Sequence, residues 1–394
     1  MAKNGPLSGI RVLDLSIAAT GPYACALLAD QGADVIKVER PGIGDIGRWV
    51  GIQVNGISAL HQMCNRGKRA IAVALEHDEG RDIVRRLAAR CDVVVQNWRP
   101  GVAERLGVGY EDLRRDDLVY VSISGFGDEG PYAHKGAYDT VIQAYGGVAA
   151  SQVDESGTPR FAPHVLADKV TALSAAQAIT AALLARERGQ GGQHVKLSML
   201  DAVVSFMWVD GAGNEVIRDG DGSQAGSFAA GARPFRFLDG WGVATPTSDS
   251  DFFGMCRAFG VDGYDDPRVA SPTLRHKHRE VTRALVDRCH EAAEKMTTAE
   301  AIARMEAERV PCGVVLSPSE LADDPHARDV GLLVDMHHPV AGAIRMPRHP
   351  LRFTATPAEL GGPAPTIGQH TDEILRELGL GDDISRLRDA GIVA

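Results

Sequence analysis

Short apolar runs alternate with longer amphipathic stretches over the first 125 residues. The apolar runs are rich in Val, Ile and Leu and fit buried strands, at 11–16, 34–39, 69–75, 92–96 and 118–124. The stretches between them predict helices at 21–32 and 78–90 and short helical segments within 104–115. Strands joined by helix-length crossovers form a mostly parallel sheet with helices on both faces. The pattern therefore predicts a doubly wound α/β fold.

The longest helical pattern begins at Asp168. The run from Lys169 to Arg188 is rich in Ala and Leu and contains no proline or glycine, which predicts a long buried helix. Further helices are predicted at 139–147 and 199–217. A carboxylate at a helix N-terminus can cap free N–H groups, or it can act as a nucleophile that forms an acyl-aspartyl intermediate. These residues alone leave both interpretations open.

Composition changes after residue 219. Residues 220–232 are rich in glycine and serine and indicate a linker. Beyond it, a hairpin pattern at 235–244 turns on Asp239-Gly240. Helical patterns follow, and we predict a second, smaller α/β domain over residues 225–325; its helices are expected at 249–259, 274–293 and 297–308. The tail from about 330 carries strand-like runs and a polar helix near 370–378.

Composition narrows the class of protein. Hydrophobic residues make up 44% and charged residues 24% of the chain, as in ordinary globular proteins. The sequence has no run of 18 apolar residues, so no membrane span is expected. A net charge of −10 without acidic blocks argues against nucleic acid as a partner. The 6 cysteines stand singly and no signal peptide is visible, so we expect a cytoplasmic protein with reduced thiols.

Six motifs in order resemble the class III CoA-transferases, a family that includes formyl-CoA transferase and α-methylacyl-CoA racemase. The match runs across residues 8–202, and its motifs are RVLDLS…TGPYACALLADQGADVIKVERPGIGD, NRGKRAIAV, VVVQNWRPG, VSISGFG, Asp168 and GQGGQHVKLSMLDA. The resemblance implies a Rossmann-like large domain, built from residues 1–219 and a return of the chain over 330–394. It also implies an intertwined homodimer.

The resemblance implies a reaction as well. Asp168 aligns with the family's catalytic aspartate, which attacks an acyl-CoA thioester and passes through a mixed anhydride and an aspartyl-CoA thioester. The implied substrates are coenzyme A, as acyl-CoA, and a small or fatty carboxylic acid; no metal or nicotinamide is expected. The GxGGQ motif at 189–193 follows a helix rather than a strand, so it is no dinucleotide fingerprint.

Basic residues are the candidate contacts for the CoA phosphates, because they can form charge-assisted hydrogen bonds. Arg40 follows a predicted strand at the sheet edge where α/β proteins bind ligands. Arg40 and Arg105 match CoA-binding arginines of the family. The other candidates around CoA are Lys68, Arg69, the pair Asn97 and Trp98, and the loop residues Ala18 and Ala19.

Two differences from family members affect which substrate and reaction we expect. Ala19 stands where formyl-CoA transferase has a glutamine, so we expect an acyl group larger or more apolar than formate or oxalate. Tyr138 and Asp139 stand where the racemase branch has a His-Asp pair. A tyrosine with an ordinary pKa of about 10 is a poor acid–base group near neutral pH, which favours transferase over racemase. A racemase, and an acyl-CoA-binding protein without turnover, remain the alternatives.

Overall fold

The computed structural model describes residues 4–154, 156–219 and 233–394. The described residues form two compact units: the large unit consists of residues up to 219 together with 331–394, and the small unit ends at Val330. The linker predicted at 220–232 lies outside the described residues. Among the described helices, none combines the length and the hydropathy that a membrane span requires.

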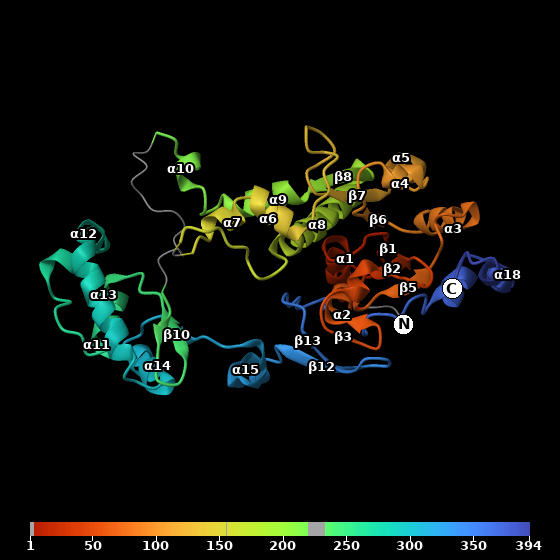
Figure 1. Ribbon diagram of the computed structural model, residues 1–394. Helices are drawn as coiled ribbons and strands as arrows, with labels where there is room; N and C mark the ends of the chain where they lie inside the picture. The colour runs from red at the N-terminus through yellow and green to blue at the C-terminus, as the bar shows by residue number, and fades with distance from the viewer. Residues whose placement is uncertain (1–3, 155, 220–232) are drawn as a thin grey trace. The chain divides into compact units, whose positions relative to one another are not determined.

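A six-stranded parallel sheet forms the centre of the large unit (Figure 1). Its strands are β1 (Arg11–Asp14), β2 (Asp34–Glu39), β5 (Arg69–Ala72), β6 (Val93–Gln96), β7 (Val119–Ser124) and β8 (Gln193–Ser198). Their spatial order is β5-β2-β1-β6-β7-β8. This is the doubly wound order of a Rossmann-like sheet, which reverses between β1 and β6. The predicted parallel α/β fold is confirmed, and the reversal marks the usual ligand crevice of such sheets.

Strand β8 is the one strand of this sheet that the sequence pattern did not predict. Gln193, His194 and Lys196 interrupt its apolar residues, so it lacks the continuous apolar run of a central strand. Its side chains are mostly half-exposed, because β8 lies at the edge of the sheet. An amphipathic edge strand gives a weak signal in a search for buried strands.

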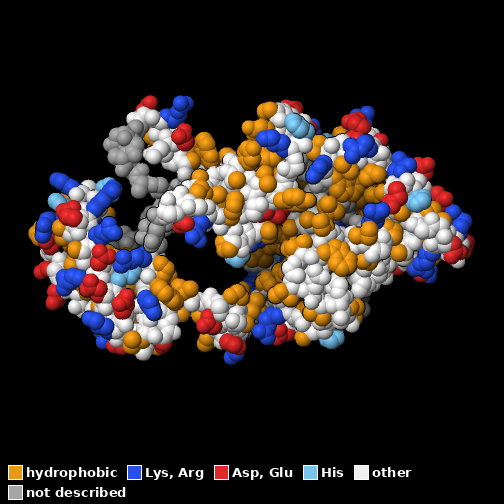
Figure 2. All heavy atoms as spheres, viewed as in Figure 1, with side chains coloured by type: hydrophobic (Ala, Val, Ile, Leu, Met, Phe, Trp, Pro, Cys, Tyr) orange, Lys and Arg blue, Asp and Glu red, His pale blue; other side chains and the backbone are white. Residues whose placement is uncertain are grey.

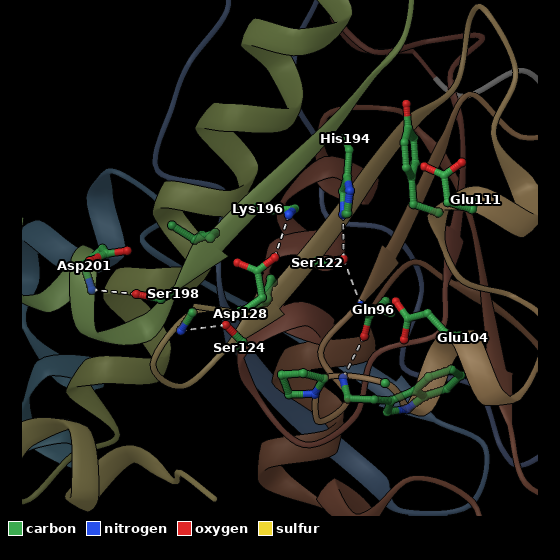
Figure 3. Close-up of a pocket in the computed structure, with 17 residues that line it drawn as sticks. Gln96, Glu104, Glu111, Ser122, Ser124, Asp128, His194, Lys196, Ser198 and Asp201 are labelled. Carbon is green, nitrogen blue, oxygen red and sulfur yellow. Dashed lines mark hydrogen bonds and ion pairs between the residues drawn. The ribbon is translucent and has the colours of Figure 1, made fainter. Parts of the chain in front are cut away.

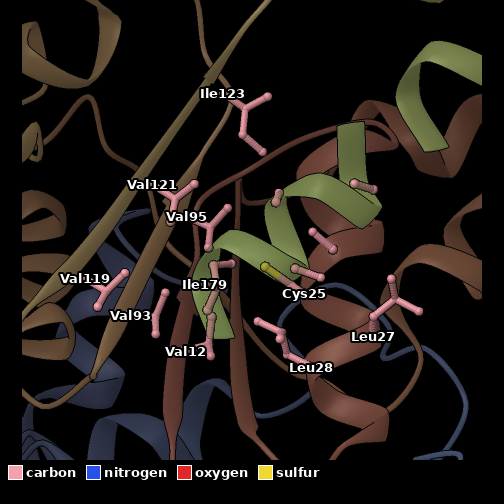
Figure 4. Close-up of a cluster of buried hydrophobic side chains, with 14 of the residues drawn as sticks. Val12, Cys25, Leu27, Leu28, Val93, Val95, Val119, Val121, Ile123 and Ile179 are labelled. Atoms are coloured by element: carbon pink, nitrogen blue, oxygen red, sulfur yellow. The ribbon is translucent and has the colours of Figure 1, made fainter. Parts of the chain in front are cut away.

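Helices cover both faces of the sheet. Valines of β1, β6 and β7 face α1 (Thr20–Asp30) and α8 (Leu166–Ala185), and the cluster contains Cys25, Leu28 and Ile179 (Figure 4). Alternate residues such as Val94 point to the opposite face, where α3 (Asp78–Ala88), α17 (Thr371–Glu377) and α18 (Ile384–Asp389) contribute to a second core. The C-terminal segment thus packs on the N-terminal sheet.

Shorter elements complete the large unit. Two small antiparallel pairs lie outside the main sheet: β3 (Gln53–Val54) with β4 (Ile57–Ser58), and β12 (Leu333–His338) with β13 (Gly342–Pro347). The remaining α-helices of this unit are α2 (Ala59–Asn65), α4 (Val102–Arg105), α5 (Tyr110–Leu113), α6 (Asp139–Tyr145), α7 (Val148–Ser151), α9 (Met199–Met207) and α10 (Gly213–Val216).

The small unit combines a short antiparallel sheet with helices. The sheet has the order β11-β10-β9, from Cys312–Val314, Trp241–Ala244 and Phe235–Arg236, so the predicted hairpin is the pair β9–β10. Phe235, Phe237, Phe252 and Phe259 are buried in its core. Its helices are α11 (Asp249–Ala258), α12 (Pro272–Lys277), α13 (Arg279–Ala293), α14 (Thr298–Ala307), α15 (Pro318–Asp323) and α16 (Pro325–Asp329).

Four charged side chains are buried where β1, β2 and β5 approach one another; we call Asp14, Lys37, Asp45 and Lys68 the buried charge cluster. Lys68 Nζ lies 2.7 Å from Asp14 Oδ2, and Lys37 Nζ lies 2.7 Å from Asp45 Oδ2. Burial alone would raise the pKa of Asp14, but Lys37 and Lys68 outweigh it and the pKa lies below its usual value. The Asp14 carboxylate is therefore ionised throughout the neutral range.

The buried charge cluster holds the loop that follows β1. Asp45 Oδ1 accepts the Ala18 N–H at 2.8 Å, and the Lys37 ammonium donates to the Ser16 carbonyl. Lys68 Nζ also donates to the Pro22 carbonyl at 2.8 Å, at the start of α1. The path of the chain from β1 into α1 is thus set by buried charges rather than by apolar packing alone.

Replacing Lys68 by methionine tests the cluster. The change keeps most of the side-chain volume but removes one of the two cations beside the buried Asp14 carboxylate. Removing one partner of a buried ion pair costs about 3–5 kcal/mol, so the free energy of unfolding should fall by about that amount. Urea unfolding at one fixed protein concentration measures it. Arg86→Met, which breaks an exposed pair with Asp82, is the control and should change the free energy of unfolding little. If Lys68→Met changes it as little as Arg86→Met does, the buried charge cluster does not stabilise the fold as described.

Candidate active site

A cavity of about 280 Å³ opens at the sheet's reversal point, beyond the carboxyl ends of β1, β6 and β7. Its walls come from the loops after these strands, from the segment before α6, and from the first turns of α8 and α9. The lining residues are Ile17, Ala18, Thr20, Ile46, Asn97, Trp98, Arg99, Pro100, Val102, Ile123, Ser124, Gly125, Ala133, Lys135, Ala137, Tyr138, Asp168 and Met199. The position agrees with the ligand crevice of doubly wound sheets.

Asp168 lies in the first turn of α8, and its carboxylate faces this cavity. The Thr20 hydroxyl donates a hydrogen bond to Asp168 Oδ1. Within the described residues, the Asp168 side chain accepts no other hydrogen bond, so it caps no backbone N–H of α8. The geometry therefore does not support the interpretation of Asp168 as a helix cap. Among the described residues, Oδ2 has no hydrogen-bond partner.

Burial changes the acidity of Asp168. The low-polarity surroundings raise the pKa of Asp168 to about 6, the Thr20 hydrogen bond lowers it, and the nearby Asp139 carboxylate raises it. The group is thus mostly ionised at neutral pH, yet it binds protons more tightly than an exposed aspartate. A poorly solvated carboxylate with a raised proton affinity is a candidate for reaction at a polarised carbonyl.

Asp139 holds the backbone of Asp168 by a hydrogen bond. It is the first residue of α6, is buried, and accepts the Asp168 N–H at Oδ2 over 3.1 Å. Its other oxygen accepts a 2.5 Å hydrogen bond from Gln143 Nε2, and Gln143 in turn bonds the chain at Ala162 and His164. Asp139 therefore takes the capping role for α8. It does not line the cavity, whereas its neighbour Tyr138 does.

The loop after β1 is fixed across the crevice. Asn97, which follows β6, accepts the Ile17 N–H at 2.7 Å and donates to the Ile17 carbonyl at 2.8 Å. Ala18 has a φ of 66°, a left-handed conformation that a non-glycine residue adopts at a cost. Ala18 lines the cavity, while Ala19 is buried. Of these two candidates, only Ala18 lines the cavity.

The basic candidates are spread over three surroundings. Arg40 lines a neighbouring cavity of about 410 Å³ and lies 3.3 Å from Glu76. Arg105 is exposed on α4 and lines none of the described cavities. Lys68 belongs to the buried charge cluster, and Arg69 pairs with Asp34, Glu373 and Glu377. The structure therefore brings Arg40 to the sheet's ligand edge but leaves Lys68 and Arg69 in structural ion pairs.

A third cavity, of about 400 Å³, lies beyond β6, β7 and β8 (Figure 3). Ser122 Oγ is 2.8 Å from His194 Nε2 and accepts a hydrogen bond from Gln96 Nε2 at 2.9 Å. Trp98 lines this cavity, the Asp168 cavity and the Arg40 cavity. The carboxyl edge of the sheet thus carries a row of adjoining cavities with Trp98 between them.

Sequence reasoning missed several residues of the site. Thr20, Arg99 and Lys135 line the cavity, but the sequence pattern singles out none of them. The nearest signal for Thr20 is its place at the start of a helix directly after β1. Within the described residues, no three His, Cys, Asp or Glu side chains are grouped so that they could hold a metal ion.

Replacing Asp168 by asparagine should raise stability in a pH-dependent way. The folded-state pKa of about 6 lies above the ordinary value of 3.8, so the folded protein keeps a proton that the unfolded chain has already released. Wild-type stability therefore falls as pH rises through this window, and asparagine avoids the loss. The variant should melt at a higher temperature than wild type at pH 7.5, and the gap should close near pH 4.

Thermal unfolding of both proteins between pH 4 and 8 measures the gap. Asp389→Asn, at the exposed end of α18, is the matched control and should show no comparable pH-dependent gap. A gap that is constant with pH, or that favours wild type at neutral pH, would contradict the raised pKa.

Comparison with known proteins identifies the family. The pattern of CoA-transferase family III matches residues 7–371. The chain is 33% identical over 398 residues to a succinyl-CoA:glutarate CoA-transferase of Mus musculus, covering 98% of this chain and 90% of the relative. It is 32% identical over 418 residues to a formyl-CoA:oxalate CoA-transferase of Rhodopseudomonas palustris, covering 98% and 97%.

A solved structure agrees with this result. The fold matches a CAIB/BAIF family protein from Brucella suis with a TM-score of 0.83 and 30% sequence identity, over 95% of this chain and 100% of the other. The resemblance predicted from the six motifs is confirmed. Since the family pattern covers nearly the whole chain and the relatives align along their length, the chain belongs to CoA-transferase family III.

Proposed function

We propose that the protein moves CoA from an acyl-CoA to a carboxylic acid, with Asp168 as the residue that carries the acyl group. Family membership and the named relatives point to CoA-transferase activity. The observation that supports a role for Asp168 is its placement: a half-buried carboxylate that lines the cavity at the sheet's reversal point and has one oxygen held by Thr20.

The proposed steps neither consume nor release a proton. Asp168 Oδ2 attacks the thioester carbonyl, the carbon–sulfur bond breaks, and a mixed anhydride and the CoA thiolate form. The thiolate attacks the aspartyl carbonyl, which releases the first acid and leaves an aspartyl-CoA thioester. The acceptor carboxylate then reverses these two steps and leaves as the new acyl-CoA. Thr20 orients the carboxylate for the first attack, and Asp139 is a positioning residue that holds the start of α8.

We place CoA along the carboxyl edge of the sheet. Arg40 supplies a cation there, and Trp98 and Asn97 follow β6 beside the Asp168 cavity. The Arg40 side chain is 63% exposed and its partner Glu76 is also exposed, so a phosphate can replace or join this pair. Lys68 and Arg69 form ion pairs within the protein, so we do not assign them to CoA. A role of Arg105 in CoA binding is supported only by its resemblance to a CoA-binding arginine of the family.

The racemase alternative lacks a second base in this geometry. A racemase needs an acid–base group on each face of the α-carbon. The residues described as lining the cavity include no histidine. Tyr138 lines the cavity but is 70% exposed, and its hydroxyl makes no hydrogen bond with a described residue. Transfer is therefore the better supported function.

The cavity walls favour an acyl group larger than formate. Ile17, Ile46, Ile123 and Met199 line the cavity together with small alanines. Burying each methylene of an acyl chain against such a wall contributes about 0.8 kcal/mol. The relatives are named for acids from formate to glutarate, so those names leave the acyl group of this chain open.

Asp168→Ala should abolish transfer. Loss of a covalent nucleophile costs roughly 10⁴-fold or more in rate, measured as exchange of a labelled acid into acyl-CoA. Asp168→Asn should be equally inactive and still bind CoA in a calorimetric titration. Near-wild-type exchange by Asp168→Ala would exclude the proposed mechanism. A wild-type protein that binds acyl-CoA without exchange would be the non-catalytic alternative.

Arg40→Ala should have the opposite effect. CoA binding should weaken by about 1–3 kcal/mol, with turnover retained at high CoA concentrations.

The pH dependence of transfer provides an independent measurement. Only the ionised carboxylate attacks, so kcat/KM should fall as pH decreases through about 6, the pKa of Asp168. Thr20→Val removes the hydrogen bond that lowers this pKa. The acidic limb of the profile should therefore move to higher pH in Thr20→Val. A limb that does not move would mean that another group controls it.

We also propose that the protein is a homodimer in a reducing cytoplasm. Helix α8 is apolar on every side, which is typical of a helix buried all round. In the single chain, however, Leu173 and Leu184 of α8 are 56% and 52% exposed. Figure 2 shows hydrophobic side chains on the large unit around α8 and α9, and such a patch is expected to be covered. All 6 cysteines are free thiols.

Light scattering tests the dimer. At low micromolar concentration the mass should be about twice the 41.9 kDa of one chain, and dilution should not release a folded monomer. Leu173→Glu should weaken association, whereas Leu351→Glu, at another exposed leucine, is the control. A stable folded monomer in wild type would contradict the proposal.

A further inference from the structure

A row of three polar side chains runs from the edge of the main sheet to the loop after β6 (Figure 3). The Trp98 N–H donates to Gln96 Oε1 at 2.9 Å. Gln96 Nε2 donates to Ser122 Oγ, also at 2.9 Å, and this oxygen lies 2.8 Å from His194 Nε2. The three side chains come from the neighbouring strands β6, β7 and β8 and line the third cavity. We call His194, Ser122 and Gln96 the relay.

The backbone N–H at one end of the relay fixes the direction of each hydrogen bond in it. A backbone N–H can only donate, so Gln96 presents Oε1 to Trp98 and Nε2 to Ser122. The Ser122 oxygen therefore accepts from Gln96, and its own proton points to His194. Nε2 of a neutral imidazole accepts that proton when Nδ1 carries the ring hydrogen. Burial and the Lys196 ammonium hold the pKa of His194 below its usual value, so the ring is neutral at neutral pH.

Aromatic rings hold His194 in place. The Tyr110 ring stacks on the imidazole with 4.5 Å between centroids and 24° between planes. The Tyr120 ring meets it edge-on at 5.4 Å, and the Tyr120 hydroxyl is itself fixed by the Val108 carbonyl at 2.9 Å. A ring packed on two sides has few alternative orientations. His194 is thus a fixed acceptor at the far end of the relay.

The state of His194 reaches the loop after β6 through the Gln96 amide. Without the imidazole acceptor, the closest alternative for the Ser122 proton is Gln96 Oε1. The amide would then turn its Nε2 toward the Trp98 N–H, and two donors would face each other. Gln96 is only 6% exposed, so water cannot easily repair this mismatch. The relay therefore stabilises one path of the backbone at Trp98, whose side chain lines three cavities.

We propose that His194 is a positioning residue for CoA binding, acting through Ser122 and Gln96 on the loop at 97–98. This inference rests on the proposed function, which places CoA beside that loop. None of the three relay residues lines the Asp168 cavity. The relay thus contributes to the affinity for CoA and leaves the chemistry of Asp168 unchanged.

Two substitutions break the relay at different points. His194→Phe keeps a ring stacked on Tyr110 but removes the acceptor, and Ser122→Ala removes the middle of the relay. Each should raise the Kd of free CoA, measured by calorimetry, roughly 3- to 10-fold, the range for one lost hydrogen bond. The KM for succinyl-CoA should rise by a similar factor while kcat changes less than about 2-fold, because the lost binding is common to ground and transition states.

A rescue and a double variant distinguish positioning from a general structural role. His194→Gln provides a side-chain oxygen that accepts the Ser122 proton, so its Kd for CoA should stay within about 2-fold of wild type. The double variant His194→Phe/Ser122→Ala should bind CoA no more weakly than either single variant, since both break the same relay. Additive losses in the double variant would overturn the inference. So would a loss in His194→Gln as large as that in His194→Phe.

His290→Phe is the matched control. His290 is also half-buried and stacks on an aromatic ring, that of Phe235, with centroids 4.1 Å apart, but it lies in the small unit. This substitution should leave the Kd of CoA unchanged, and an equal effect of His290→Phe and His194→Phe would overturn the inference. Circular dichroism and melting temperatures report whether each variant is folded.

Hydrogen exchange of the Trp98 amide separates this inference from the proposed function, since it requires neither CoA nor turnover. Exchange should be faster in His194→Phe and Ser122→Ala than in wild type and His194→Gln. Unchanged exchange would overturn the relay even if Asp168 proved to be the nucleophile. Faster exchange with unchanged CoA affinity would overturn the positioning role. In a protein that binds CoA but transfers no acyl group, the calorimetric comparison still decides.

Discussion

The buried ion pair between Asp14 and Lys68 determines where the loop after β1 lies. Asp14 ends β1, and Lys68 precedes β5 by one residue, so the pair joins strands on either side of β2. Lys37 and Asp45 extend the network to the Ala18 N–H. Buried charges are costly unless every partner is in place, and for that reason this arrangement permits few alternative loop positions. Thr20, at the end of the loop, then meets Asp168 from a fixed direction.

The candidate site combines this rigid support with one carboxylate, Asp168, whose charged form is poorly stabilised by its surroundings. Asp168 has a single hydrogen bond from a side chain and lies close enough to Asp139 that the two carboxylates repel each other. Asp139 in turn is satisfied by the Asp168 N–H and by Gln143. Asp139 thus accepts two hydrogen bonds, whereas the side chain of Asp168, which lines the cavity, accepts one from the described residues. This is a common division at reactive sites, where stability is given up for reactivity.

Much of this could be predicted from sequence, for physical reasons that differ by residue. Continuous apolar runs predict five strands of the main sheet, whereas the edge strand β8 mixes His194 and Lys196 with its apolar residues. Asp168 could be located by its motif, but its state depends on Asp139, 29 residues earlier in the chain. Lys68 looks like an available cation until the fold buries it against Asp14, 54 residues away. The charges of Arg99 and Lys135 are visible in the sequence; their convergence on one cavity is a property of the fold.

The hydrogen bond from Thr20 makes the two oxygens of Asp168 chemically distinct, and this has a consequence for the atoms of the protein itself. In the proposed sequence, attack of the thiolate on the aspartyl carbonyl expels the first acid together with the former Oδ2. The acceptor acid later restores that position with an oxygen of its own. Each turnover would therefore replace one oxygen of the enzyme with one from its substrate. The oxygen bonded to Thr20 would stay, provided that the bond prevents the carboxylate from rotating between cycles. A heavy-isotope label in the acceptor would accumulate in Asp168 as a single atom, so the protein would retain a record of its last reaction.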